Sequence, residues 1–139
     1  MASVRSLHLV LGVGGVLAFL GTGAYMATHF PEAYGGGEPI RYMYRANHVY
    51  LLLASLVNLA IGMYRGSTRP GWRVVLGATG SALVLAALLI LLYAFFVEPP
   101  RGVPERPATL IGVFVLLLGV LLQWPNRTPR GEPDRRREP

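Results

Sequence analysis

Residues 72–97 read WRVVLGATGSALVLAALLILLYAFFV, an apolar stretch whose only charged residue is Arg73. A helix rises about 1.5 Å per residue, and roughly 20 apolar residues are enough to cross the hydrocarbon core of a bilayer. The stretch is long enough for that, and it lies between Pro70 and Pro99. It therefore predicts a transmembrane helix and places the chain among membrane proteins.

The composition of the 139 residues agrees with this class. Hydrophobic residues make up 53% and charged residues 14%, and the mean hydropathy is +0.44, which leaves too little polar surface for a soluble domain. Every basic residue is an arginine, and the chain has no cysteine. Schiff-base chemistry on lysine, disulfide bonds and iron–sulfur clusters are therefore excluded.

Three more apolar segments, residues 7–30, 43–64 and 108–124, share the character of residues 72–97, and all 11 prolines fall outside the four. The sequence predicts an all-α, integral membrane four-helix bundle over residues 1–125. The Arg- and Pro-rich residues 126–139 would form a polar tail. Each of the two halves contains a run from glycine through tyrosine to proline, Gly12–Pro31 and Gly80–Pro99, which suggests a duplicated helical hairpin.

The arginines predict the orientation of this bundle. Nine of them lie near the N-terminus, in the segment Arg65–Arg73 and in the tail, whereas four lie in the other two loops. By the positive-inside rule both termini are expected in the cytoplasm. Because the arginines sit at the ends of apolar runs, we expect them to face lipid headgroups and expect no nucleic acid partner.

The segment RYMYRANHVY opens the second apolar stretch and carries the strongest candidate site. Arg41, Arg45 and His48 are spaced to share one helix face, and Tyr44 lies in the same turn. His29 is placed near the same end of the first stretch. Two histidines can ligate the iron of a b-type haem while guanidinium groups pair with its propionates. The pattern therefore predicts haem b bound by His48 and His29, with Arg41, Arg45 and Tyr44 around the cofactor.

Each predicted haem ligand also has an alternative, purely structural role. His29 would be an interfacial histidine among headgroups, and His48 a buried residue bonded to a backbone carbonyl. His8, at the opposite end of the first stretch, is a weaker candidate, because iron ligation there would need His8 of a neighbouring subunit. The alternative for His8 is a terminal histidine whose ring reaches toward the lipid headgroups. Gly12 and Gly15 on its face leave room either for a macrocycle or for another helix.

Other polar residues suggest packing or loops. Asn58 is expected to bond a carbonyl or a hydroxyl of the third helix as a structural clamp. All seven acidic residues are expected in loops or in the tail, outside the membrane spans. An ion pump usually needs an acid within the bilayer, and no nucleophile–histidine pair or phosphate loop is visible. No enzyme activity is therefore indicated.

The segment Arg45–Tyr64, in which a histidine opens the helix and Asn-Leu-x-x-Gly closes it, resembles the second helix of small bacterial inner-membrane proteins. The resemblance covers about one helix of the four. It implies a bacterial inner (cytoplasmic) membrane protein in which His48 and Asn58 matter.

Two functions follow as expectations, and a small-molecule carrier is kept as a third alternative. One is a haem-binding, cytochrome-like protein for electron relay or haem holding. The other is a cofactor-free accessory subunit that braces a larger respiratory or photosynthetic complex. In either case we expect glycine-lined helix faces to support a homo-oligomer, such as a dimer, or assembly with other subunits in the lipid bilayer.

Overall fold

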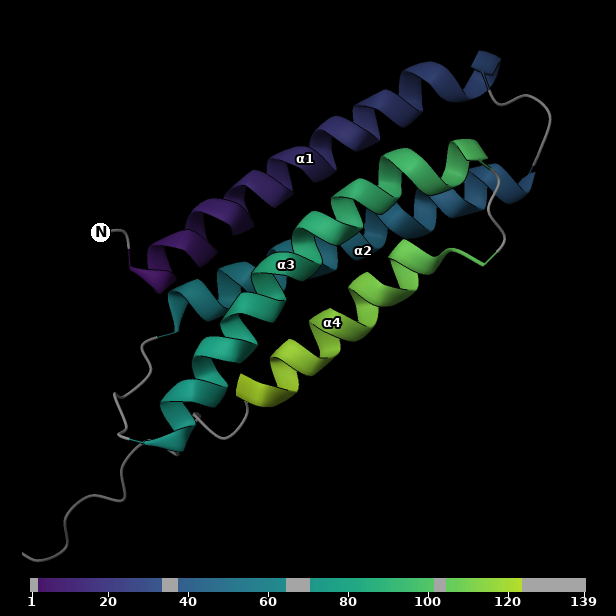
Figure 1. The fold of residues 1–139 in the computed structure, drawn as a ribbon. Helices are drawn as coiled ribbons and strands as arrows, with labels where there is room; N and C mark the ends of the chain where they lie inside the picture. The colour runs from purple at the N-terminus through teal and green to yellow at the C-terminus, as the bar shows by residue number, and fades with distance from the viewer. Residues whose placement is uncertain (1–2, 34–37, 65–70, 102–104, 124–139) are drawn as a thin grey trace, which may run out of the picture.

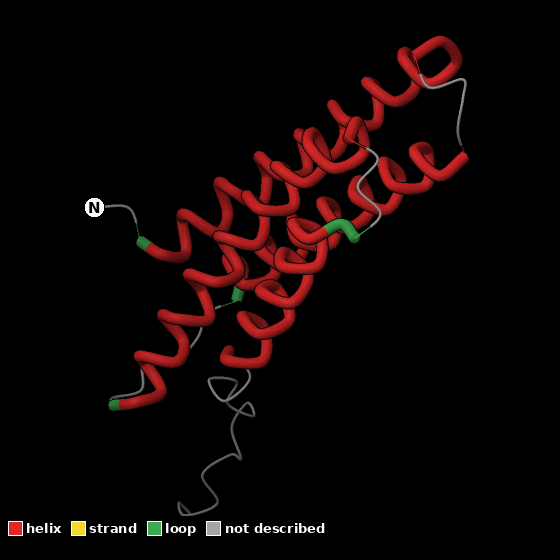
Figure 2. The backbone as a smooth tube through the Cα atoms, turned by 45° about the vertical axis from the view of Figure 1, so that its right-hand side comes forward, coloured by secondary structure: helices red, strands yellow, loops and turns green. Residues whose placement is uncertain are grey.

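The computed structural model describes residues 3–33, 38–64, 71–101 and 105–123. These residues form four helices and no strand: α1 (Val4–Ala33), α2 (Glu38–Met63), α3 (Trp72–Arg101) and α4 (Pro107–Gln123). The helices lie side by side along one long axis, and successive helices run in opposite directions (Figures 1 and 2). The all-α four-helix prediction is confirmed, whereas the polar tail lies outside the described residues.

The helix ends differ from the expected ones where prolines occur. Helix α2 begins at Glu38 rather than at residue 43, and α3 continues through Pro99 and Pro100 to Arg101 rather than ending at residue 97. Proline breaks the interior of a helix. In the last turn, each proline removes only one backbone hydrogen bond, and no further turn follows that would be disrupted. The longer α3 matters for the site, because it takes Glu98 into the helix.

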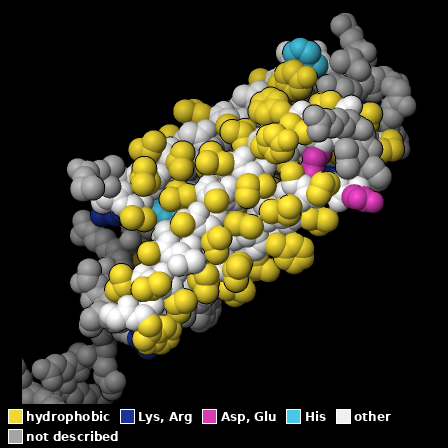
Figure 3. Space-filling view, viewed as in Figure 1, with side chains coloured by type: hydrophobic (Ala, Val, Ile, Leu, Met, Phe, Trp, Pro, Cys, Tyr) yellow, Lys and Arg dark blue, Asp and Glu magenta, His cyan; other side chains and the backbone are white. Residues whose placement is uncertain are grey.

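The distribution of polar and apolar side chains is that of a membrane protein. Helices α1, α2 and α3 are long and apolar enough to cross a bilayer, and α4, with 17 residues, is a shorter apolar helix. Figure 3 shows hydrophobic side chains covering the face in view between charged ends. Large exposed side chains such as Leu17, Leu53 and Leu117 contrast with the buried Asn47 and Asn58. In water the reverse would be expected.

Glycines bring α1 and α2 into close contact. A Cβ atom at Gly12 would lie 2.8 Å from the Leu59 side chain and 2.9 Å from its backbone nitrogen. The contact is reciprocal, because a Cβ at Gly62 would lie 2.8 Å from the side chain of Leu9. Each helix thus places a leucine over a glycine of the other. Small residues at such crossings let backbones approach closely, which drives helix pairing in lipid.

The second pair of helices, α3 and α4, is also closely packed at glycines. A Cβ at Gly80 would meet the carbonyl oxygen of Gly119 at 2.8 Å, and one at Gly112 would meet Leu91 at 2.8 Å. Helices α1 and α3 are both 30 residues long, and Gly12 and Gly80 occupy the same place in each. The sequence echo therefore coincides with two hairpins of similar build.

An apolar core between α2 and α3 joins the hairpins. It contains Leu51 and Ala54 of α2, Val84, Ala87, Leu88 and Leu91 of α3, and Leu116 of α4. Among the described residues no Cα atom of α1 lies within 8 Å of one of α4, so the bundle is open between its first and last helices. That opening is where a pocket lies.

Candidate functional site

Polar side chains in the interior gather at opposite ends of the bundle. One cluster surrounds His8 and Asn58, near the start of α1 and the end of α2. The other contains Asn47, Glu98 and Thr109, near the start of α2 and of α4. Buried polar groups within a membrane span are costly, so each cluster calls for a specific explanation.

The first cluster is built on a hydrogen bond between His8 and Asn58. His8 is 1% exposed, and its Nδ1 lies 2.8 Å from Oδ1 of Asn58. The Asn58 amide nitrogen donates to the carbonyl oxygens of Ala54, at 2.9 Å, and Val84, at 3.4 Å. Since carbonyl oxygens only accept, the amide nitrogen must face them and the amide oxygen must face His8.

This arrangement determines which nitrogen of His8 carries the hydrogen. The amide oxygen of Asn58 can only accept, so Nδ1 of His8 must be the donor. In the neutral ring Nε2 is then a bare acceptor. Among the described residues Nε2 has no hydrogen-bond partner, although it is buried. Such a group costs about 1–3 kcal/mol when nothing pairs with it.

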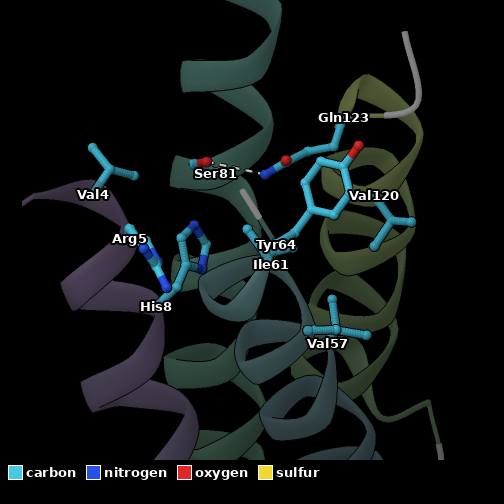
Figure 4. Close-up of a pocket in the computed structure, with 10 residues that line it drawn as sticks. Val4, Arg5, His8, Val57, Ile61, Tyr64, Ser81, Val120 and Gln123 are labelled. Carbon is cyan, nitrogen blue, oxygen red and sulfur yellow. Dashed lines mark hydrogen bonds between the residues drawn. The ribbon is translucent and has the colours of Figure 1, made fainter. Parts of the chain in front are cut away.

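His8 lines a pocket of about 520 Å³ that opens between the helices. The lining comes from all four helices: Val4, Arg5, His8, Val57, Ala60, Ile61, Tyr64, Ser81, Val120 and Gln123. Figure 4 shows the imidazole projecting from α1 toward Tyr64 and Ser81, with Gln123 bonded to Ser81 at 3.0 Å. Pockets of several hundred Å³ with apolar walls and few polar groups are typical of small-molecule sites.

Glycines beside His8 do not widen this pocket. A Cβ at Gly12 would strike Leu59, and one at Gly15 would strike the Ser55 side chain. Of the two readings open from the sequence, room for a macrocycle or for another helix, the second is confirmed. The Arg5 side chain also braces α2, because its Nε donates to the Gly62 carbonyl at 2.8 Å.

The second cluster joins three helices through Glu98, which is 3% exposed. Its carboxylate accepts hydrogen bonds from the backbone nitrogens of Ala108, at 2.6 Å, and Thr109, at 3.2 Å, and from the Thr109 hydroxyl. The first N–H groups of a helix have no partner within it, and its dipole favours a negative charge there. A carboxylate of α3 thus caps the N-terminus of α4.

Asn47 extends this cluster, which we call the Glu98 network, to α2. Its amide nitrogen donates to the Ala94 carbonyl at 3.1 Å, and its oxygen accepts from Arg106. The same oxygen lies 2.8 Å from the Thr109 hydroxyl, whose single hydrogen can go either to Asn47 or to Glu98. Arg106 has φ 45°, a left-handed conformation that costs about 1–2 kcal/mol for a residue other than glycine. The guanidinium contacts hold this turn directly before Pro107.

The Glu98 network corrects one expectation. All acidic residues were expected outside the spans, but Glu98 lies in α3, inside the segment Trp72–Pro100 that is apolar and long enough to cross a membrane. The expectation was wrong because Pro99 and Pro100 suggested an earlier helix end. The signal was present in Arg106-Pro107, since proline favours the first helical position and marks where α4 needs a cap.

The candidate haem ligands lie apart along α1. His48 contacts the Thr22 hydroxyl, at 3.0 Å from Nδ1, and stacks on Phe19 with ring centroids 3.9 Å apart. His29 is exposed, lies 3.0 Å from the carbonyl of Tyr25 through Nδ1 and stacks on the Tyr25 ring. Thr22 and His29 are seven residues apart on α1, about 10 Å along the helix axis, and the His29 ring folds back only as far as Tyr25, so the two histidines contact α1 at different levels.

The remaining residues of that prediction have other contacts. Helix α2 does extend back beyond Arg41, but the Arg41 guanidinium donates to the Phe30 carbonyl at 3.1 Å, near the end of α1. Tyr44 is buried against Phe30 and Phe95, and Arg45 is exposed. The structure therefore gives His48 and His29 separate partners on α1, and haem ligation by this pair stays a prediction.

Of the three histidines, the weakest candidate from the sequence is the one best placed to bind something. Among the described residues no group of three His, Cys, Asp or Glu side chains is arranged to hold a metal ion. Asn58 does bond a carbonyl of α3, as expected, but its partner on α1 was not indicated by the sequence. No protein-family model, curated protein sequence or solved structure matches this chain.

Proposed function

We propose that this chain is an integral membrane protein that binds a lipid-soluble ligand in the pocket beside His8. The carrying observation is the buried Nε2 of His8, which has no partner within the described residues and which, in the neutral ring, can only accept a hydrogen bond. Apolar walls from Val57, Ile61 and Val120 suit a ligand that partitions into the bilayer. A bound ligand would offset the cost of the unpaired nitrogen.

Analysis of the bound molecules tests this function. We expect protein purified from membranes in detergent to retain a lipid-soluble molecule, detected by mass spectrometry after extraction with organic solvent. His8→Leu should lose it, since the substitution removes the acceptor. His48→Leu, a matched change on α2 outside the pocket, should keep it. Identical extracts from all three proteins would refute ligand binding at His8.

The absorption spectrum of the same samples tests the haem hypothesis. Haem b held by His48 predicts a reducible Soret band that disappears in His48→Leu. The separation of His48 from His29 argues against this outcome. A protein with neither spectrum nor extractable ligand would leave the accessory-subunit hypothesis, in which the helices only brace a larger complex or a second copy of the chain.

We also propose that all four helices cross the bacterial inner membrane and that both termini face the cytoplasm, as the arginine distribution predicts. The natural chain has no cysteine, so single cysteines report their side through a membrane-impermeant maleimide. We expect Ser3→Cys and Met63→Cys to react only from the cytoplasm and Glu105→Cys only from the outside. Labelling of Ser3→Cys and Glu105→Cys from the same side would contradict this topology.

A further inference from the structure

The hydrogen-bonding state of His8 restricts the chemistry of its ligand. The neutral ring must carry its hydrogen on Nδ1, because Asn58 presents only its amide oxygen there. Rotating that amide would aim its nitrogen at His8 and its oxygen at the carbonyls of Ala54 and Val84, losing both bonds. Nε2 is therefore held as an acceptor by contacts on two other helices, and a partner at Nε2 must be a donor.

Other polar side chains of the pocket already have hydrogen-bond partners within the protein. Gln123 and Ser81 bond each other at 3.0 Å, and the Arg5 Nε is bonded to Gly62. Among the described lining residues, His8 holds the one buried polar side-chain atom without a partner. The ligand's essential polar group is thus the one that meets Nε2.

We propose that the His8 pocket selects lipid-soluble molecules that carry a hydroxyl hydrogen, namely phenols and hydroquinones, over molecules of equal size that offer only carbonyl or carboxylate oxygens. This inference rests on the proposed function. A hydroxyl group can donate to Nε2, whereas a quinone carbonyl or a carboxylate would direct its lone pairs at the lone pair of the nitrogen. A hydroquinone and its quinone differ in little but this hydrogen.

The position of the pocket suits such an amphipathic molecule. Arg5 lies in the first turn of α1 and Gln123 ends α4, so the pocket lies near one end of the bundle. A hydroxyl group at this depth would meet His8 while the apolar body lies along Val57 and Ile61. A metal ion at Nε2 would need further ligands, and no group of three candidate ligands is present in the described residues.

Binding of three matched probes tests the selectivity. The probes are a decyl-substituted benzohydroquinone, the corresponding quinone and the dimethyl ether of the hydroquinone, titrated calorimetrically into the full-length protein in lipid nanodiscs. One hydrogen bond to a buried acceptor is worth about 1.4 kcal/mol, so we expect the hydroquinone to bind about ten-fold more tightly than the other two. His8→Leu should remove this preference, and His48→Leu should retain it.

Nitrogen NMR of histidine-labelled native protein provides a readout that does not depend on a variant's folding. We expect the His8 hydrogen on Nδ1 before and after hydroquinone is added, with the change in chemical shift at Nε2. Equal affinities for hydroquinone and quinone, or a hydrogen on Nε2, would overturn the selectivity. If binding of both probes still depends on His8, the proposed function survives. If no probe binds and no ligand is extracted, both proposals fail.

Discussion

Replacing Glu98 with alanine is expected to lower the free energy of unfolding by about 3 kcal/mol, because a buried carboxylate that holds several donors is lost. The backbone nitrogens of Ala108 and Thr109 would lose the carboxylate that accepts hydrogen bonds from both. The Thr109 hydroxyl would lose a partner as well. The measurement is helical circular dichroism of the detergent-solubilised protein during denaturation with increasing dodecyl sulfate.

Two further variants make this measurement specific. Glu98→Gln keeps the shape and one acceptor oxygen, so it should cost about 1 kcal/mol. Glu105→Ala removes an exposed carboxylate before the same helix and should change stability by less than about 0.5 kcal/mol. Equal effects of Glu98→Ala and Glu105→Ala would show that Glu98 does not cap α4.

The second large effect is expected at the crossing of α1 and α2. Gly12→Ala should destabilise the protein by about 2 kcal/mol, because the added methyl group overpacks an already filled contact. Its Cβ would lie 2.9 Å from the backbone nitrogen of Leu59, which can retreat only if the helices separate. The same dodecyl sulfate denaturation measures the loss.

Gly14→Ala is the matched control for this prediction. It makes the same change two residues away in the same helix, where a Cβ would meet no atom within 4 Å. Since alanine is the better helix former by up to about 1 kcal/mol, stability should stay the same or rise. Equal losses at both glycines would mean that the helices do not approach each other as described.

Much of the site could not be read from the sequence, and His8 shows why. Its place one turn from the helix start suggested a terminal histidine that reaches toward headgroups. Burial instead follows from α2, which brings Asn58 to its Nδ1, and from α3, whose Val84 carbonyl orients Asn58. These contacts join residues far apart in the chain, so no local pattern announces them.

His48 and Arg41 show the same limit of sequence-based prediction, because the sequence suggested a shared site for residues that have separate partners in the structure. The prediction that both residues lie on the second helix is correct, because α2 includes Arg41 and His48. Their use depends on the register between α1 and α2, which places Arg41 at the Phe30 carbonyl and His48 at Thr22. The register follows from the close packing of Gly12 on Leu59 and of Gly62 on Leu9.

The apolar pattern of the sequence was enough to predict four helices and the approximate positions of the three loops between them. It could do so because a bilayer imposes its demand on each segment separately: length, apolarity and an internally bonded backbone. The packing of the helices against one another brings the polar side chains together: His8 with Asn58, and Glu98 with the start of α4. These hydrogen bonds depend on distances of a few ångströms between different helices. The hydrophobic pattern along a single helix contains no information about those distances.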